Sequence, residues 1–277
     1  MKKANAKVTA QGAPMRIWYQ SFTDHDETRA YHDRLSEHID RIARPGTQID
    51  VVGMSPPARR HRITETRCAL DAVKNAIRAE REGYDAYILG HFQDSGLWDS
   101  RSAVDIPVVG LGENAMLHAC TLGRKIGLVT IHPIHIPYHE DQVLRYGLQQ
   151  RVVAVAAVES AANDYVLAFG DPKVAKAIGA KYAKEIRSLI DRGIEVVIPA
   201  GGLPSLLFGA ALKVSAAPAV VLDSVALAVK AAEMAVDLKR FNGTAPSRAS
   251  TFALPWPAVY DALGLSQPGA KGKGKKR

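Results

Sequence analysis

The sequence contains few cysteines and no long apolar run. Its only cysteines are Cys68 and Cys120, too few for the disulfide frameworks that stabilise small secreted proteins. The longest apolar runs, such as residues 216–222, fall well short of the roughly 20 residues that a membrane-spanning helix needs. Residues 1–14 are polar and basic, without the apolar segment of a secretory signal. We therefore expect a cytoplasmic protein that does not associate with a membrane.

The body of the chain has no excess of positive charge, although the net charge of the whole sequence is +8. The charge is concentrated at the two ends, so a basic groove for nucleic acid is not indicated and no specific nucleic-acid partner is expected. Residues 1–13 and the basic residues 266–277 have too little apolar content to fold, and we expect both to be disordered tails. The residues that account for the excess are Lys2, Lys3, Lys7, Lys271, Lys273, Lys275, Lys276 and Arg277.

Strand and helix patterns alternate along the chain. With 277 residues, 47% of them hydrophobic and 23% charged, the composition is that of a globular protein with a substantial core. Short β-branched runs followed by helical periodicity predict parallel sheets covered by helices, with functional groups at the carboxyl ends of the strands. We expect strands at residues 16–20, 48–52, 86–90, 107–109, 125–130, 152–156, 195–199 and 219–222, and helices at 28–43, 67–82, 114–122, 171–191 and 224–239.

Two segments of the first half are repeated in the second half. GYDAYILGHFQDSG, from Gly83, resembles GIEVVIPAGGLPSL, from Gly193. IPVVGLGENAMLHA, from Ile106, resembles APAVVLDSVALAVKAA, from Ala217. Both pairs are separated by about 110 residues, and matching order and spacing indicate a duplicated α/β unit. The loops after the first pair of strands should then face each other across a pseudo-twofold axis.

These segments resemble the Asp/Glu/hydantoin racemase superfamily, and hydantoin racemases most. The similarity runs in family order from about Met15 to Leu238 through MRIWYQSFT, GYDAYILGHFQDSGL, IPVVGLGENAMLHACTLGRKIGLVT, VLRYGL, GIEVVIPAGG and APAVVLDSVALAVKAAEMA. The resemblance implies an α/β fold of two pseudo-symmetric lobes, each a parallel sheet flanked by helices, with the active site in the cleft between them. We expect the first lobe to comprise residues 14–119 and 224–265, and the second residues 120–223.

The resemblance also implies chemistry without a cofactor, a small carboxylate or amide substrate, and assembly into a homo-oligomer. Racemases of this family carry one cysteine on each lobe; one removes a proton beside a carbonyl and the other returns it on the opposite face. In this sequence the first cysteine falls on His91 and the second on Gly201. Cys68 and Cys120 lie in predicted helices away from these loops, so we do not expect a two-cysteine racemase.

His91 is the catalytic candidate, because it follows a predicted strand where the family carries its base. An imidazole with a pKa near about 6.5 suits proton removal or donation, although a structural histidine bonded to a loop carbonyl is the alternative. Opposite it, Gly201 and Gly202 offer either backbone N–H groups or a tight turn. With a side chain on one face only, a lyase or isomerase with one-sided proton transfer fits better than racemisation.

Polar residues at the other strand ends are candidate substrate contacts, with turn and cap formation as the alternative. Asp94 is expected to contact substrate or to cap the helix that follows it, and Thr130 to donate its hydroxyl into the cleft. The substrate-binding candidates are Gln20, Ser21, Thr23, Asp94, Ser95, Thr130, Gly201 and Gly202.

The segment IHPIHIPYHEDQ, which follows KIGLVT, is rich in histidine. Pro133 and Pro137 argue against a regular helix there. With His91 from the other lobe, His132 and His135 are candidate ligands for a divalent metal such as zinc. Such a metal would activate water and make the protein a hydrolase of a small amide, cyclic imide or lactone. The spacing matches no known zinc motif, so polar substrate contacts or exposed loop histidines remain open.

A third hypothesis belongs to a different class. The absence of both family cysteines is also expected of a non-catalytic protein that binds small molecules on a racemase scaffold. Bound metal in the purified protein would favour the hydrolase, and an intact cleft without turnover of any candidate substrate would favour the binding protein.

Overall fold

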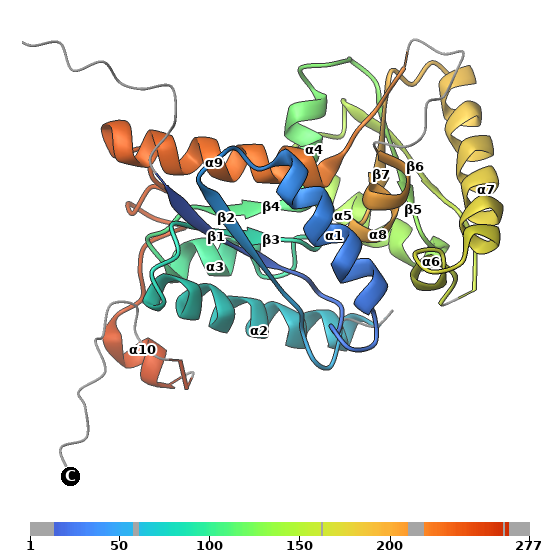
Figure 1. The fold of residues 1–277 in the computed structure, drawn as a ribbon. Helices are drawn as coiled ribbons and strands as arrows, with labels where there is room; N and C mark the ends of the chain where they lie inside the picture. The colour runs from blue at the N-terminus through green and yellow to red at the C-terminus, as the bar shows by residue number, and fades with distance from the viewer. Residues whose placement is uncertain (1–13, 58–60, 162, 210–218, 263, 266–277) are drawn as a thin grey trace, which may run out of the picture.

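The fold consists of two lobes, each built on a four-stranded parallel sheet (Figure 1). The computed structural model describes residues 14–57, 61–161, 163–209, 219–262 and 264–265. The sheet order is β2-β1-β3-β4 in the first lobe and β6-β5-β7-β8 in the second. The strands are β1 Met15–Gln20, β2 Thr47–Val52, β3 Ala86–Leu89, β4 Val108–Gly110, β5 Ile126–Thr130, β6 Val152–Ala157, β7 Val196–Ala200 and β8 Val220–Val221.

The two sheets have the same connectivity. In each, the first strand in the chain pairs with the second on one side and with the third on the other, and the fourth joins the third. The repeated sequence segments form β3 and β7, and then β4 and β8, which hold matching places in the two sheets. The α/β fold with two parallel sheets flanked by helices is therefore confirmed.

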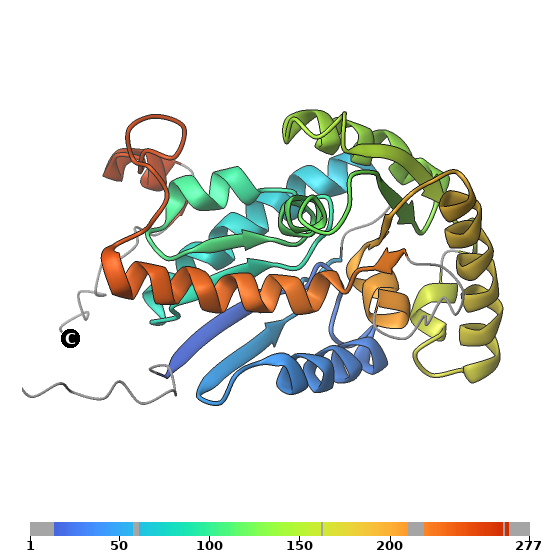
Figure 2. The same cartoon turned by 90° about the horizontal axis from the view of Figure 1, so that it is seen from above.

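The first sheet buries both faces, as side chains alternate along its strands. Ile17 and Ile88 pack with residues of α1, α4 and α9, whereas Trp18 and Tyr87 pack with residues of α2 and α3. Although α9 follows the second sheet in the chain, Figure 2 shows it lying along the first sheet. These helices are α1 Arg29–Ile42, α2 Arg62–Arg81, α3 Leu97–Ala103, α4 Leu111–Ala119 and α9 Ser224–Asn242.

The second sheet shares a core with the first. Leu128 and Ile198 join the cluster that contains Ile17 and the inner face of α9, so the two lobes are packed against each other. The opposite face, with Val129, packs with residues of α7. The remaining helical elements are η1 Pro133–His135, α5 Ile136–Arg145, α6 Asp164–Leu167, α7 Pro172–Asp191, α8 Gly202–Pro204, the π-helical η2 Ser205–Gly209 and α10 Pro257–Ala262.

The histidine-rich segment after β5 is helical, contrary to the expectation from its prolines. Pro133 lies in the first turn of η1 and Pro137 in the first turn of α5. The N–H groups of a first helical turn have no acceptor within the helix, so proline is tolerated there. His135 therefore lies in η1, and His139 lies in α5.

None of the helices in the described residues combines the length and apolar character needed to cross a membrane. The two predicted tails, residues 1–13 and 266–277, lie outside the described residues.

Candidate active site

A cavity of about 790 Å³ lies between the two lobes. Its wall is built where β1, β3, β5 and β7 end, which are the first and third strands of each sheet. Ser21 and Thr23 come from the loop after β1, His91 from the loop after β3, Thr130 from the end of β5 and Gly201 from the loop after β7. The carboxyl ends of parallel strands thus converge on one space, as is usual for binding sites in such sheets.

His91 lies in the wall of this cavity with its side chain 14% exposed. Its ring stacks on Phe22, with the ring centroids 4.4 Å apart. Burial lowers the pKa of His91, and the nearby Glu65 carboxylate partly opposes this effect. A histidine with a lowered pKa is largely neutral near pH 7 and able to accept a proton.

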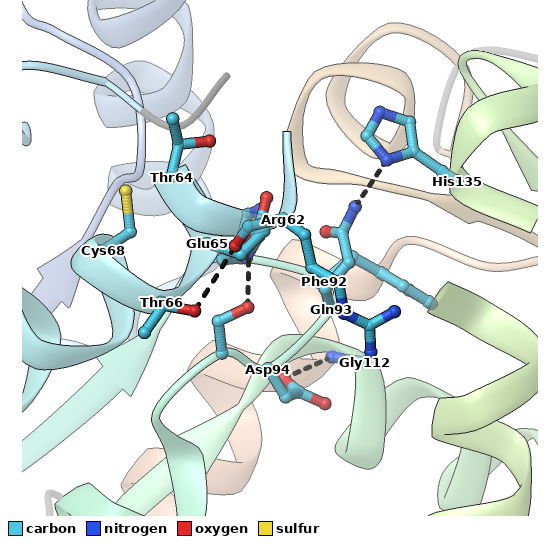
Figure 3. Close-up of polar contacts among 12 residues, drawn as sticks. Arg62, Thr64, Glu65, Thr66, Cys68, Phe92, Gln93, Asp94, Gly112 and His135 are labelled. Carbon is cyan, nitrogen blue, oxygen red and sulfur yellow. Dashed lines mark hydrogen bonds and ion pairs between the residues drawn. The ribbon is translucent and has the colours of Figure 1, made fainter. Parts of the chain in front are cut away.

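Glu65 is a site residue that the sequence did not predict. It lies in the first turn of α2 and near the loop that carries Asp94 (Figure 3). Its Oε2 lies 3.6 Å from His91 Nδ1 and accepts a hydrogen bond of 2.8 Å from Ser95 Oγ. We expected this helix to begin at residue 67, whereas it begins at Arg62. A carboxylate favours the first turn of a helix, but that signal does not indicate contact with residue 91.

Hydroxyl groups gather on the cavity wall after β1. Ser21 Oγ and Thr23 Oγ1 are 3.0 Å apart, and Thr28 donates to Thr23 Oγ1 at 3.1 Å. Tyr31 lines the same side of the cavity. The structure therefore brings the predicted Ser21 and Thr23 to the cavity and adds Thr28 and Tyr31 from the start of α1.

Gln20 does not line the cavity, in contrast to the expectation from its strand-end position. Its side chain is fully buried. The amide donates to Ser21 O at 2.8 Å and to Val52 O at 3.1 Å, while its Oε1 accepts from Asn75 Nδ2 and Trp18 Nε1. Gln20 therefore holds the ends of β1 and β2 in place, because its side chain points into the first lobe.

Asp94 and Ser95 also do not line the cavity. Asp94 is buried, and its Oδ1 accepts from Gly112 N at 3.1 Å (Figure 3). Its Oδ2 accepts from Tyr146 Oη at 2.7 Å and from Gln142 Nε2 at 2.8 Å. The Asp94 side chain thus binds the start of α4 and does not cap α3, the helix that follows Asp94 in the chain. Through Gln142 and Tyr146 it also links the two lobes. Burial raises the pKa of Asp94 to about 7.

Both glycines after β7 line the cavity, and a Cβ atom on either would come within 3.0 Å of a neighbouring side chain. Gly201 has φ +149°, and a Cβ atom there would lie 2.9 Å from Pro204 Cδ. A Cβ atom on Gly202 would lie 2.7 Å from the hydroxyl of Tyr31. The backbone at Gly201 is therefore shaped for glycine, and it offers the cavity backbone atoms only.

The histidines after β5 do not come together at the cavity. His135 lines the cavity and its Nδ1 lies 3.3 Å from Gln93 Nε2 (Figure 3). His132 accepts from Ile134 N through Nδ1 and does not line the cavity. In the part of the chain that the structure describes, no group of three or more His, Cys, Asp or Glu side chains is arranged to hold a metal ion. The metal site expected from His91, His132 and His135 is therefore not formed.

Comparison with known proteins identifies the family. The model of the Asp/Glu/hydantoin racemase family matches residues 27–232. The chain belongs to this family. It is 32% identical over 179 residues to a hydantoin racemase of Rhizobium meliloti, covering 64% of this chain and 69% of the relative. It is 27% identical over 220 residues to a hydantoin racemase of Pseudomonas sp. (strain NS671), covering 79% of this chain and 84% of the relative.

Solved structures of this family have the same fold. The allantoin racemase of Pseudomonas fluorescens is 27% identical with a TM-score of 0.69, covering 88% of this chain and 98% of that protein. The allantoin racemase of Klebsiella pneumoniae is 22% identical with a TM-score of 0.74, and the match covers 90% of this chain and 98% of that protein. The family membership and the two-lobed fold inferred from the sequence motifs are thus confirmed.

Proposed function

We propose that this racemase-family protein is a cofactor-independent isomerase or lyase that moves a proton at the carbon beside a carbonyl or carboxylate of a small molecule. His91 is the acid/base group. The observation that carries this proposal is the place of His91, which follows β3 closely and lines the cavity between the lobes. Burial lowers the pKa of His91, and the charge of Glu65 partly opposes this lowering. Proton transfer by such a group accelerates reactions by roughly 10²–10⁴-fold.

The proton is transferred on one face of the substrate. A racemase that uses two bases needs a second acid/base group, and Gly201, where the resemblance implies the second cysteine, has no side chain. Its φ of +149° and the approach to Pro204 disfavour any other residue. This arrangement suits stereospecific protonation, as after a decarboxylation, better than inversion of a centre.

The substrate is held by the polar wall of the cavity. Ser21 and Thr23 line the same cavity as His91, with their hydroxyl oxygens 3.0 Å apart, and Gly201 and Gly202 bring backbone there. Hydrogen-bond donors aimed at a carbonyl or carboxylate oxygen stabilise the negative charge that develops as the proton leaves. Because the relatives are named for hydantoin and allantoin, cyclic ureides with a carbon–hydrogen bond beside a carbonyl are suitable first candidates, together with small carboxylates.

Exchange of the substrate proton with solvent tests this function. The purified protein would be incubated in deuterium oxide with 5-substituted hydantoins, allantoin and 2-substituted malonates, while NMR follows loss of the carbon-bound proton and release of carbon dioxide. Optical rotation would report the configuration. We expect stereospecific exchange or decarboxylation that falls at least about 100-fold in His91→Ala. His118→Ala, on the exposed surface of α4, is the matched control and should be as active as the unmodified protein.

Each other outcome contradicts part of the proposal. Exchange that proceeds with racemisation at the same rate would require a second acid/base group. Turnover that survives in His91→Ala would remove His91 from the reaction. Saturable binding of these molecules without turnover would identify a binding protein. Assembly into a homo-oligomer and a cytoplasmic location remain predictions.

A further inference from the structure

A buried chain of hydrogen bonds runs from the cavity to the contact between the lobes. Thr130 lines the cavity, and its Oγ1 lies 3.1 Å from His139 Nε2. His139 Nδ1 lies 3.2 Å from Gln142 Oε1, and Gln142 Nε2 lies 2.8 Å from Asp94 Oδ2. His139 and Gln142 are fully buried, so each of their polar atoms depends on these partners.

The direction of every bond in this chain follows from one carbonyl group. Gln142 Nε2 lies 2.6 Å from Phe92 O. A backbone carbonyl only accepts hydrogen bonds, so the atom that faces it must be the amide nitrogen of Gln142. The amide oxygen then faces His139 Nδ1 and can only accept. Nδ1 of His139 must therefore carry a proton, whatever the protonation state of Asp94.

The other nitrogen of His139 is then left without a proton. Burial lowers the pKa of His139 to about 4, although its hydrogen bond with Gln142 opposes this. Phe92 contacts the ring edge-to-face, with the centroids 5.5 Å apart, and supplies no charge. A neutral imidazole has one N–H group, here on Nδ1, so Nε2 is an acceptor. The hydroxyl of Thr130 must donate to it, which uses the single proton that this hydroxyl has.

We propose that Thr130 presents a hydrogen-bond acceptor to the cavity, and that it favours molecules that place an N–H or O–H group against it over those that place a carbonyl or carboxylate oxygen there. This reverses the expectation that Thr130 donates into the cleft. Oxygen lone pairs set against those of Thr130 would be repelled, whereas an amide, imide or ureido N–H would be bound. His139 and Gln142 are positioning residues that act through Thr130.

The selection of substrates rests on the proposed function, but the bond directions do not. They can therefore be tested in protein without any substrate. Protein labelled with ¹⁵N in its histidines would be examined by long-range proton–nitrogen NMR between about pH 6 and pH 8, where unperturbed histidines titrate. His139→Gln would assign the signal of His139.

We expect His139 to remain neutral across this range, with the proton on Nδ1 and an unprotonated Nε2. In Thr130→Val, the Nε2 signal should move to the position of a nitrogen that accepts no hydrogen bond, whereas Thr130→Ser should leave it in place. A proton on Nε2, or a charged His139 near neutral pH, would overturn the proposal.

Ligand binding tests the selection with hydantoin and 1,3-dimethylhydantoin, which lacks N–H groups. Thr130→Val should weaken hydantoin binding by about tenfold, the value of one hydrogen bond, and Thr130→Ser should bind as the unmodified protein does. Binding of the dimethyl compound should be the same in all three proteins. An equal loss for both compounds, or no loss for hydantoin, would contradict the role of Thr130 as acceptor. Failure of the proposed function itself would instead appear as absent proton exchange with the tautomer unchanged.

Discussion

The carboxylate of Glu65 affects the pKa of its neighbour His91. Glu65 Oε2 lies 3.6 Å from His91 Nδ1, and its negative charge stabilises the protonated imidazole. Burial lowers the pKa of His91, and the Glu65 carboxylate keeps it from falling further. Glu65→Gln keeps the size and removes the charge, so we expect the pKa of His91 to fall. The acid limb of the pH–rate profile should shift to lower pH, which NMR titration of His91 would check directly.

Glu140→Gln is the control for this change, because Glu140 is an exposed residue on α5 that does not line the cavity. It should leave the titration of His91 unchanged. The pair would have no tuning role if Glu65→Gln and Glu140→Gln gave the same profile. A rise in the pKa of His91 would mean that the carboxylate acts on it with the opposite sign.

The start of α4 depends on a close approach between two elements. A Cβ atom on Gly112, in the first turn of α4, would collide with Phe92 O and with Gln142 Nε2. The same turn is held by the bond from Gly112 N to Asp94 Oδ1. Overpacking of a buried contact costs roughly 1–3 kcal/mol, so we expect Gly112→Ala to lower the free energy of unfolding by about that amount in urea.

Gly179→Ala tests whether this effect belongs to α4 and not to glycine replacement in general. Gly179 lies within α7, and a Cβ atom there would lie 3.7 Å from Phe208 Cε1, an ordinary contact. Alanine favours a helix over glycine by roughly 1 kcal/mol, so this variant should be slightly more stable. A destabilised Gly179→Ala beside a neutral Gly112→Ala would contradict the packing that we describe.

At the scale of the whole molecule, the net charge of +8 resides in the ends of the chain. Residues 14–265 are formally neutral, so binding to polyanions should depend on the tails and not on the cavity. We expect the full chain to be retained on heparin at low salt. Replacing Lys271, Lys273, Lys275 and Lys276 by serine should weaken retention and leave proton transfer unchanged. Retention that is not weakened by these replacements would contradict a role of the C-terminal tail in binding polyanions.

Much of the fold was determined by the sequence alone, because its signals are local. Alternating and β-branched runs place each strand of the described residues, and the spacing of about 110 residues between repeated segments corresponds to the matching order of the two sheets. The resemblance places His91 and Gly201 at strand ends, and both line the cavity. Strand ends are predictable because each follows from the pattern of its own few residues.

Only the tertiary structure decided which way the polar side chains at those ends point. Gln20 and Asp94 point into buried networks, while Glu65, from a helix that begins earlier than its pattern predicts, reaches His91. In our proposal, the direction of the Thr130 hydroxyl bond follows from Phe92 O, a carbonyl group of the other lobe, because this group orients the amide of Gln142 and so sets which nitrogen of His139 carries the proton. These outcomes depend on partners distant in the sequence, and a buried polar atom takes whichever partner the packed fold brings within hydrogen-bond reach.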